Sequence, residues 1–407
     1  MPCDLRRRVP ESVVHLVQPV DGGVARVVID LVRAQTRAGM RVVIACPPGG
    51  ELPRAAAAAG AEVRVWLAER GPGPNLPWEA AYAGRLLRRA GPEVVHLHSS
   101  KAGLAGRLAL RGRMPTVFQP HAWSFEALTG PAARLAAAWE RRAARWAGRV
   151  LCVSEAERAR GEAAGLSARW SVIPNGVDLE RYPEADGVAR RGARAALATV
   201  HGLPQRAPLV VCVGRLTRQK GQDVLLRAWP RVAARVPGAR LALVGDGPER
   251  PGLGAVAGPD VLLAGHTEDA GPWYAAADAV VLPSRWEGMA LAPLEAMAVG
   301  RPVVLTDVGG ARETLPEGQA PHCLVPPGDP DALADALAAL LLDPARRAAL
   351  GRAAAAHARR SHDVRRTAAA CLGLYAEMLA GRGGEEAGPR RPGGPEPVPD
   401  AREFSRP

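Results

Sequence analysis

The stretch VVLPSRWEGMALAPLEAMAVGRPVV, residues 280–304, decides the fold of this chain. Its first apolar run is typical of a strand, a loop and a helix-type segment follow, and a second apolar run begins at residue 302. Two strands joined through a helix are typical of a parallel sheet, because parallel neighbours need a crossover connection. The stretch therefore predicts an α/β fold that is built on a doubly wound parallel sheet.

The same alternation of strand and helix patterns extends in both directions from this stretch. Strand-type runs are expected at 12–17, 41–47, 62–66, 94–98, 116–120, 149–154 and 170–175, and again at 209–214, 240–247, 261–265, 279–284, 302–306 and 322–327. We therefore predict two doubly wound domains, at 1–180 and 209–362, with a polar, arginine-rich linker at 181–208. Residues 382–407 have little apolar surface to bury and are predicted to be a disordered tail.

The basic charge of the chain is almost entirely arginine. The formal net charge is +12, and among 53 basic residues only Lys101 and Lys220 are lysines. A basic excess is compatible with nucleic acid, anionic lipid or an anionic substrate as a partner, or with biased amino-acid usage alone. No RNA-binding motif with interleaved aromatic residues is present in the sequence, which disfavours nucleic acid.

Cysteine usage and hydropathy favour a cytoplasmic protein. The six cysteines are scattered singly, without the paired spacing of a metal site, and are predicted to be reduced, buried thiols. Residues 1–20 contain no apolar segment long enough for a signal peptide. No apolar run reaches the roughly 18 residues that a membrane span requires.

Three features of the first domain are candidates for ligand binding. Gly22 and Gly23 follow the first strand and open a helix, where backbone N–H groups can approach an anion, although a plain turn remains an alternative. Lys101 is expected in the first turn of a helix, where a cation is unfavourable, so it is a candidate for binding an anion or the acceptor substrate, or else a solvated lysine. His121 follows the strand at 116–120 and is placed to contact a sugar or a phosphate. His96 and His98 alternate on a buried strand, but the further ligands of a zinc site cannot be placed.

The second domain begins with two cations after its first strand. Arg215 and Lys220 stand in the loop between the strand 209–214 and a helix that is expected to start near Gln222. Two cations there can hold both phosphates of a diphosphate and neutralise its charge as it leaves. Asp246, in a glycine-rich turn after the next strand, is a candidate substrate contact or merely the start of that turn.

The segment EGMALAPLE, 287–295, places two carboxylates on either side of an uncharged run. The spacing alone is compatible with an acid and a base, as in a hydrolase. Pro293 fits the first position of a helix, which would put Glu295 in the first turn and leave Glu287 in the preceding loop. Backbone N–H groups at the start of that helix, from Gly288, Met289, Ala290 and Leu291, would then form an anion site between two hydroxyl-binding glutamates.

These residues resemble the paired-glutamate motif of the retaining glycosyltransferases of family 4. The segments GRLTRQKGQDVLL, LVGDGPER, IPNGVD, the Gly22–Gly23 loop and HLHSSKAGLAGR match that family in the same order, over about residues 10–380. HSSKAG and PHAWSFE are most similar to members that build bacterial polysaccharides. Met289 stands where the family commonly has an aromatic residue, and Ala122 and Trp123 follow the motif histidine in place of the commoner glycine, so sugar selectivity stays open.

The resemblance implies a GT-B architecture of two Rossmann-like domains that face a cleft, with the C-terminal helix 363–381 packed back on the acceptor-side first domain. The second domain would hold a nucleotide-diphosphate sugar, either a UDP- or a GDP-sugar. Arg215 and Lys220 would bind the diphosphate, and Gly22 and Gly23 would approach it from the first domain. Glu287 and His121 would lie at the donor sugar.

Carried over in the same way, Glu295 would bind the ribose, and the backbone of residues 288–291 would reach phosphate or sugar. The implied reaction transfers the sugar to a glycan or lipid-linked acceptor with retention of configuration, and it requires no metal or other cofactor.

Two further interpretations remain open from the sequence. GT-B architecture also serves sugar-nucleotide epimerases and hydrolases, although the motifs here match transferases better. The arginine-rich helical stretch 131–149 carries Trp139 and Trp146, which would either face the core or sit on an anionic membrane. In the second case the protein would be peripheral at the inner face of the cell membrane.

Overall fold

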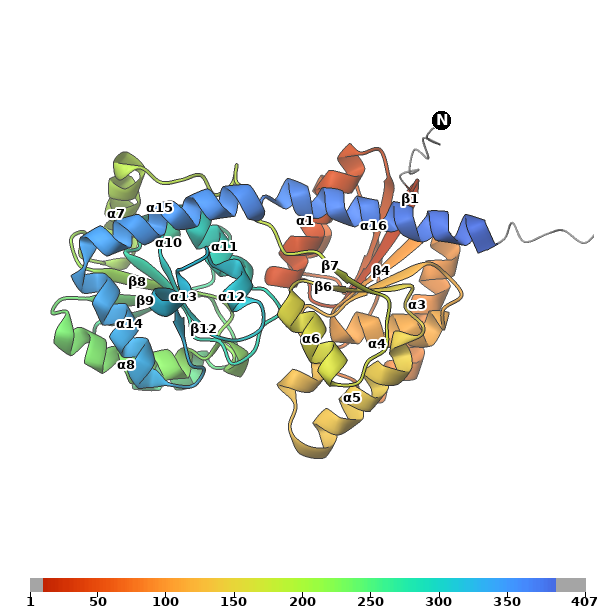
Figure 1. The fold of residues 1–407 in the computed structure, drawn as a ribbon, viewed down its shortest axis with the longest axis horizontal. Helices are drawn as coiled ribbons and strands as arrows, with labels where there is room; N and C mark the ends of the chain where they lie inside the picture. Colours follow the sequence, from red (N-terminus) through yellow and green to blue (C-terminus); the bar gives the residue numbers. More distant parts are fainter. Residues whose placement is uncertain (1–9, 386–407) are drawn as a thin grey trace, which may run out of the picture.

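The computed structural model describes residues 10–385, which form two α/β units side by side (Figure 1). Within that range one sheet has seven strands in the order β3-β2-β1-β4-β5-β6-β7, and the other has six in the order β10-β9-β8-β11-β12-β13. Every neighbouring pair in both sheets is parallel. The predicted class of two doubly wound parallel-sheet domains is therefore confirmed.

The first unit extends from β1 to β7. Its strands are β1 Ser12–Val17, β2 Arg41–Cys46, β3 Glu62–Val65, β4 Val94–His98, β5 Thr116–Gln119, β6 Arg149–Cys152 and β7 Trp170–Val172. Its helices are α1 Gly23–Arg37, α2 Glu51–Ala58, α3 Leu76–Ala90, α4 Ser99–Leu110, the 3₁₀ turn η1 Ser124–Ala127, α5 Gly130–Ala144 and α6 Glu155–Ala163.

The second unit follows after a connecting segment that holds α7. Its strands are β8 Leu209–Val213, β9 Arg240–Val244, β10 Val261–Gly265, β11 Ala279–Leu282, β12 Val303–Thr306 and β13 Leu324–Val325. The remaining helices are α7 Gly187–His201, η2 Arg218–Lys220, α8 Gln222–Arg235, α9 Arg250–Val256, α10 Gly271–Ala276, α11 Leu291–Ala298, α12 Ala311–Thr314, α13 Ala320–Cys323, α14 Pro330–Leu342, α15 Pro344–Ser361 and α16 Val364–Glu385.

The central strands are buried along their whole length because helices cover both faces of each sheet. All residues of β1 and β4 are buried, and so are those of β11 and β12. Strands of this type form continuous apolar runs, which is why their positions were predictable. In each sheet the strand order reverses next to the first strand of the unit, between β1 and β4 and between β8 and β11. Ligands bind at such reversal points, beyond the carboxyl ends of the strands.

The last helix returns to the first unit. Figure 1 shows α15 on the second unit and α16 on the first, nearly end to end along one side of the molecule. Tyr375 of α16 is fully buried and belongs to the apolar cluster that also holds Val13 and Val28 of the first unit. The return of this helix, implied by the resemblance at 363–381, is present as α16. The predicted disordered tail starts too early, because residues 382–385 are the last part of α16, and residues 386–407 lie outside the described residues.

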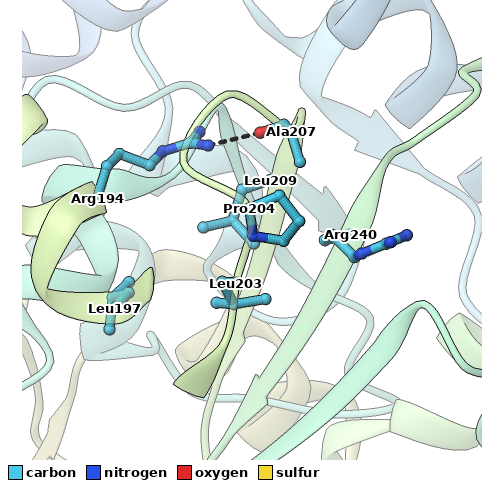
Figure 2. A pocket seen from close by; sticks show the side chains of 7 residues that line it. All are labelled: Arg194, Leu197, Leu203, Pro204, Ala207, Leu209 and Arg240. Atoms are coloured by element: carbon cyan, nitrogen blue, oxygen red, sulfur yellow. Dashed lines mark hydrogen bonds between the residues drawn. The ribbon is translucent and has the colours of Figure 1, made fainter. Parts of the chain in front are cut away.

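The segment predicted as a linker is held against the second unit by α7. Arg194 donates to the carbonyl of Ala276 at 2.5 Å, to the carbonyl of Ala207 at 2.5 Å and to Asp278 at 2.7 Å. Figure 2 shows the shallow depression beside these contacts, which Arg194, Leu197, Leu203, Pro204, Ala207, Leu209 and Arg240 line. It has no free volume for a water molecule. We therefore assign it to packing.

Two further expectations are met within the described range. Cys46, Cys152, Cys212, Cys323 and Cys371 are buried with free thiols, and Cys3 lies outside the described residues. Burial raises the pKa of the Cys46 thiol to about 11, so that thiol is protonated and unreactive at neutral pH. None of the helices in residues 10–385 has both the length and the apolar character to cross a bilayer.

Candidate functional site

The loops at the carboxyl ends of β1, β5, β8 and β11 meet between the two units. A Cβ atom added at Gly22 would lie 3.7 Å from the side chain of Arg215. A Cβ added at Gly288 would lie 3.1 Å from the backbone carbon of His121 and 2.9 Å from Val153. Residues far apart in the sequence are thus brought together from both units, as the strand reversal points predict.

Lys220 and Glu287 form an ion pair at the centre of this region. Lys220 Nζ lies 2.5 Å from Glu287 Oε1, and Ser284 Oγ donates to the same oxygen at 2.7 Å. The side chains are 16% and 11% exposed, so the pair is shielded but still reachable. Gly221 makes this approach possible: its φ is +68°, and a Cβ there would lie 2.0 Å from the carbonyl oxygen of Pro283.

Arg215 lies beside this pair and has no carboxylate within ion-pair distance among the described residues. Burial lowers the pKa of Arg215, the Arg70 guanidinium lowers it further, and Glu287 acts in the opposite direction. Two half-buried cations, one already paired with Glu287 and one unpaired, leave an excess positive charge that suits an anionic ligand.

The loop after β11 turns its carbonyl groups toward its neighbours. The Gly288 carbonyl accepts from Gly310 N at 2.6 Å and from Ser154 Oγ at 3.3 Å, and the Met289 carbonyl accepts from Asn175 Nδ2 at 2.7 Å. No backbone N–H of residues 288–290 donates to a backbone carbonyl in the described part of the chain. These N–H groups, with those at the start of α11, are free to bind an anion.

The start of α11 differs from the prediction by two residues. The helix begins at Leu291, with Ala290 as its N-cap, and Pro293 is its third residue. Proline is accepted there because none of the first N–H groups of a helix has an intrahelical partner. Glu295 is consequently in the second turn, and the expectation that it lies in the first turn is wrong.

Glu295 is buried and hydrogen-bonded to an aromatic residue. Tyr274 donates to its Oε2 at 2.7 Å. Burial raises the pKa of Glu295, and the hydrogen bond from Tyr274, the Arg26 guanidinium and the Tyr182 hydroxyl act in the opposite direction. Arg26 belongs to α1 of the first unit, so the glutamate lies where both units contribute charge.

His121 takes an unusual backbone conformation. Its φ is +58°, and that of Ala122 is +117°, both in the region that side chains rarely adopt. Burial lowers the pKa of His121 to about 3, so the ring is neutral at physiological pH. Strained backbone of this kind clusters at functional sites, and here it lies in the loop whose backbone approaches Gly288 of the second unit.

Among the described residues, the side chains of Lys101 and Asp246 make no hydrogen bond or ion pair with Arg215, Lys220 or Glu287. Lys101 is buried and forms an ion pair with Glu79 at 2.5 Å, and it donates to the Gly71 carbonyl at 2.8 Å. Both partners are far from it in the sequence, and they satisfy its charge, so the structure does not support acceptor binding by Lys101. The Asp246 carboxylate accepts from Gly247 N at 2.7 Å, and its side chain is exposed. Gly23 is exposed at the start of α1 with no heavy atom within 4 Å of an added Cβ.

Sequence reasoning missed Glu157, a buried carboxylate behind His121. It accepts from Ala122 N at 2.6 Å and from Val153 N at 2.7 Å, so it fixes the loop that carries His121. Its own backbone N–H donates to Ser154 Oγ, the N-cap of α6. The Ser-x-x-Glu spacing of a capping box was a signal for a buried role, although this glutamate reaches past the cap to the neighbouring loop.

Glu157 makes the stability of the protein depend on pH. Burial raises its pKa from 4.5 to about 7. A carboxyl with a raised folded-state pKa binds its proton more tightly in the folded protein, so its stabilising contribution is present below pH 4.5 and is lost as the pH rises through about 7. Relative to Glu157→Gln, the free energy of unfolding of the wild type is expected to fall by on the order of 3 kcal/mol over this range.

Urea denaturation of both proteins at several pH values measures this difference. Glu155→Gln, an exposed position on the same helix, is the control and should follow the wild type at every pH. A constant difference between Glu157→Gln and the wild type from pH 4 to pH 8, within about 0.5 kcal/mol, would contradict the assignment.

Comparison with known proteins identifies the family. Residues 21–181 match the family model described as Glycosyltransferase Family 4, and residues 207–343 match the one described as Glycosyl transferases group 1. The chain is 38% identical over 250 residues to the GDP-mannose-dependent alpha-(1-6)-phosphatidylinositol monomannoside mannosyltransferase of Mycolicibacterium smegmatis, covering 57% of this chain and 62% of that protein. It is 38% identical over 224 residues to the D-inositol 3-phosphate glycosyltransferase of Saccharomonospora viridis, covering 51% of this chain and 50% of that protein. The chain therefore matches between half and two-thirds of the length of these relatives.

Solved structures share the fold over almost the whole chain. Anabaena HepE, crystallised with UDP and glucose, has a TM-score of 0.76 and 23% sequence identity, and the match covers 90% of this chain and 99% of that one. WaaG, a glycosyltransferase involved in lipopolysaccharide biosynthesis, has a TM-score of 0.71 and 19% identity over 89% of this chain. The chain therefore has a GT-B fold, with a domain of the Glycosyltransferase Family 4 type in its first unit and one of the Glycosyl transferases group 1 type in its second.

Proposed function

We propose that this protein transfers a sugar from a UDP- or GDP-sugar to a glycan or lipid-linked acceptor, with retention of configuration, in the synthesis of cell-surface polysaccharide or glycolipid. The observation that carries this proposal is the group of charges between the units, in which the Lys220–Glu287 pair lies beside the unpaired Arg215. Family membership supports the reaction class, and both curated relatives described above are named as transferases.

In this scheme the diphosphate of the donor lies between the two units. Arg215 and Lys220 bind its phosphates from the second unit, and the backbone of Gly22 and Gly23 approaches them from the first. As the bond to the sugar breaks, negative charge grows on the leaving phosphate, and the two cations stabilise that charge. Because they supply the positive charge, the scheme needs no cofactor other than the donor, and turnover should persist in the presence of EDTA.

The two glutamates serve different parts of the donor. Glu295 is placed to accept from the ribose hydroxyls, and Glu287 contacts the sugar while it orients Lys220. The acceptor hydroxyl attacks the face of the sugar from which the diphosphate departs, which retains the configuration. His121, neutral and strained, accepts a hydrogen bond from a sugar hydroxyl. The free N–H groups of residues 288–291 add donors to the phosphate or the sugar.

GDP-mannose is the donor that we propose to test first, because several of the curated relatives are named as GDP-mannose-dependent. A bound ligand raises the apparent stability by about 2.7 kcal/mol at a concentration of 100 times its Kd. A thermal-shift series with GDP-, UDP- and ADP-sugars, followed by calorimetry, is therefore expected to show a rise in Tm with one donor class. Absence of a shift with every nucleotide sugar would overturn the proposed function.

Glu295→Ala tests the ribose contact in the same assay. The affinity for the nucleoside diphosphate is expected to fall about 10- to 100-fold, since two hydroxyl groups lose a charged acceptor. Glu317→Ala, an exposed glutamate of the same unit, is the matched control and should bind as the wild type does. Equal affinity of Glu295→Ala and the wild type would remove Glu295 from the donor site.

A lipid-linked acceptor would bring the protein to the inner face of the cell membrane, and α5 is the surface that we propose for this contact. Arg134, Arg141 and Arg142 are exposed on it, and Leu135 is 74% exposed. Trp139 of this helix and Trp146, just after its end, do not add anchors, because both are half-buried and their rings pack against each other at 6.0 Å.

Sedimentation with vesicles that contain anionic phospholipid should carry down the wild type. The double variant Arg134→Glu, Leu135→Glu should stay in the supernatant. The control Arg352→Glu, which changes an exposed arginine on α15, should sediment with the vesicles as the wild type does. Equal sedimentation of all three proteins, or none with anionic vesicles, would exclude α5 as a membrane contact.

A further inference from the structure

A line of hydrogen-bonded imidazoles extends from His121 into the core of the first unit. His121 Nε2 lies 3.1 Å from His98 Nδ1, and His98 Nε2 lies 2.9 Å from His15 Nδ1. His15 Nε2 in turn lies 2.8 Å from Gln35 Oε1. His15 and His98 stand on the adjacent strands β1 and β4, and both are fully buried. Neither the proposed mechanism nor the packing of a sheet requires three linked histidines there.

The line continues to the last helix. Gln35 Nε2 donates to the Tyr375 hydroxyl of α16 at 3.5 Å, and that hydroxyl lies 2.6 Å from His96 Nδ1. His96 Nε2 and Gln119 Oε1 are buried, and neither has a partner within hydrogen-bond distance in the described residues.

Every ring in the line is neutral. Burial lowers the pKa of His15 to about 4, that of His121 to about 3, and those of His96 and His98 well below the usual value. A neutral imidazole has one N–H donor and one bare acceptor nitrogen. Each ring that accepts at one nitrogen therefore donates at the other. Once the donor and acceptor are known for one hydrogen bond, they are known for every bond along the line.

The Gln35 amide sets the direction. Its Oε1 can only accept, so His15 Nε2 carries the proton and donates to it. Its Nε2 can only donate, so the Tyr375 hydroxyl accepts from it and donates its own proton to His96 Nδ1.

The remaining links are then determined one by one. His15 donates through Nε2 to Gln35, so His15 Nδ1 is bare and accepts from His98 Nε2. His98 Nδ1 is consequently bare and accepts from His121 Nε2.

We propose that this line holds His121 in the tautomer with the proton on Nε2, so that its Nδ1 is the ring nitrogen available to accept from a hydroxyl of the donor sugar. The role of His121 rests on the proposed function, whereas its tautomer does not. His98, His15, Gln35 and Tyr375 are then positioning residues, and the last helix acts on the reaction site through them.

A metal site is the competing explanation for these histidines. One nitrogen from each of His15, His96 and His98 lies within 4.8 Å of the others. Both nitrogens of His15 and of His98 are already engaged in hydrogen bonds. The 2.9 Å between His15 Nδ1 and His98 Nε2 is also shorter than the roughly 3.3 Å between ligands of a tetrahedral zinc with bonds of about 2.0 Å. Hydrogen bonding therefore accounts for the arrangement better than a metal does.

Long-range ¹H–¹⁵N correlation of histidine-labelled protein tests the proposal without reference to activity. The ring signals of His121, identified by their loss in His121→Gln, should show protonated Nε2 and bare Nδ1 in the wild type. Tyr375→Phe removes the hydroxyl that joins Gln35 to His96. The direction of hydrogen-bond donation along the line is then no longer fixed, and His121 is expected to show both tautomers. If the proposed function holds, kcat should also fall about ten-fold with little change in KM, as for a lost orienting partner.

Thr367→Val is the matched control, because Thr367 Oγ1 on the same helix donates to the Pro174 carbonyl and does not touch the line. Thr367→Val should lower Tm about as much as Tyr375→Phe does, but it should leave the tautomer of His121 and kcat unchanged. Protonated Nδ1 on His121 in the wild type would overturn the proposal, and so would an unchanged tautomer in Tyr375→Phe. Stoichiometric zinc binding that shifts the signals of His15, His96 and His98 would replace it with the metal site. A correct tautomer without transferase activity would refute the proposed function alone.

Discussion

Lys220→Ala is expected to lower the rate of sugar transfer by about 10²- to 10³-fold, the effect of removing one preorganised donor from a developing negative charge. In the proposed scheme Lys220 joins Glu287 to the leaving diphosphate, and the ion pair at 2.5 Å holds the two side chains together. Glu287→Gln should cause a loss of similar size, because the amide keeps the shape but leaves Lys220 without its counter-charge. Single-turnover rates with the donor identified by thermal shift measure both effects.

The two losses are not expected to add. Since Lys220 and Glu287 act as one unit, the double variant should be about as slow as either single variant. Arg218→Ala changes an exposed cation of the same 3₁₀ turn and should retain the wild-type rate within about two-fold. Near-normal turnover in folded Lys220→Ala and Glu287→Gln would show that the transfer site lies elsewhere.

Gly309→Ala is expected to abolish most of the activity although residue 309 touches no substrate in the proposed scheme. Its φ is +51°, and a Cβ there would lie 1.9 Å from the Glu287 carbonyl oxygen. The loop that carries Glu287 must therefore move, which we expect to cost about 2–5 kcal/mol of stability and about 100-fold in transfer. Thermal unfolding and single-turnover rates together separate the two effects.

Gly318→Ala is the control for backbone strain. Its φ is +80°, and an added Cβ meets nothing within 4 Å. It should lose only about 1 kcal/mol, with normal transfer. Equal transfer rates in the two alanine variants would mean that the Glu287 loop tolerates displacement.

Much of the fold was predictable because buried parallel strands and their connecting helices leave local patterns. β1 and β4 are mostly apolar runs that histidines interrupt, and the βαβ pattern around 280–304 predicts the parallel order. The first residue of α11 was not predictable. A proline gives the same sequence signal at any position in the first turn of a helix.

The sequence points to candidate site residues when their motif lies within a single loop. Arg215, Lys220 and Glu287 follow strand ends within their own loops, and the structure brings them together as expected. The ion pair of Lys101 was not predicted because its partner Glu79 belongs to another helix, and no local pattern shows that pairing.

Contacts between distant segments escape such patterns for the same reason. The sequence shows that His96 and His98 alternate along one strand. It does not show the hydrogen bond between His96 and Tyr375, because Tyr375 stands on α16, 279 positions after His96. Glu157 was overlooked because one of its two hydrogen-bond donors, Ala122 N, lies in a loop 35 positions earlier, although the other, Val153 N, is only four positions away.

The crossing of α16 onto the first unit has a consequence for recombination between relatives. A crossover in the connecting segment near residue 180 would deliver a foreign copy of α16 together with the second unit, and Tyr375 would meet an unmatched Gln35 and His96. An exchange confined to residues 209–343 would replace the donor-binding unit and leave that partnership intact. Modular shuffling of donor specificity in this chain therefore requires two breakpoints, one on each side of the exchanged unit.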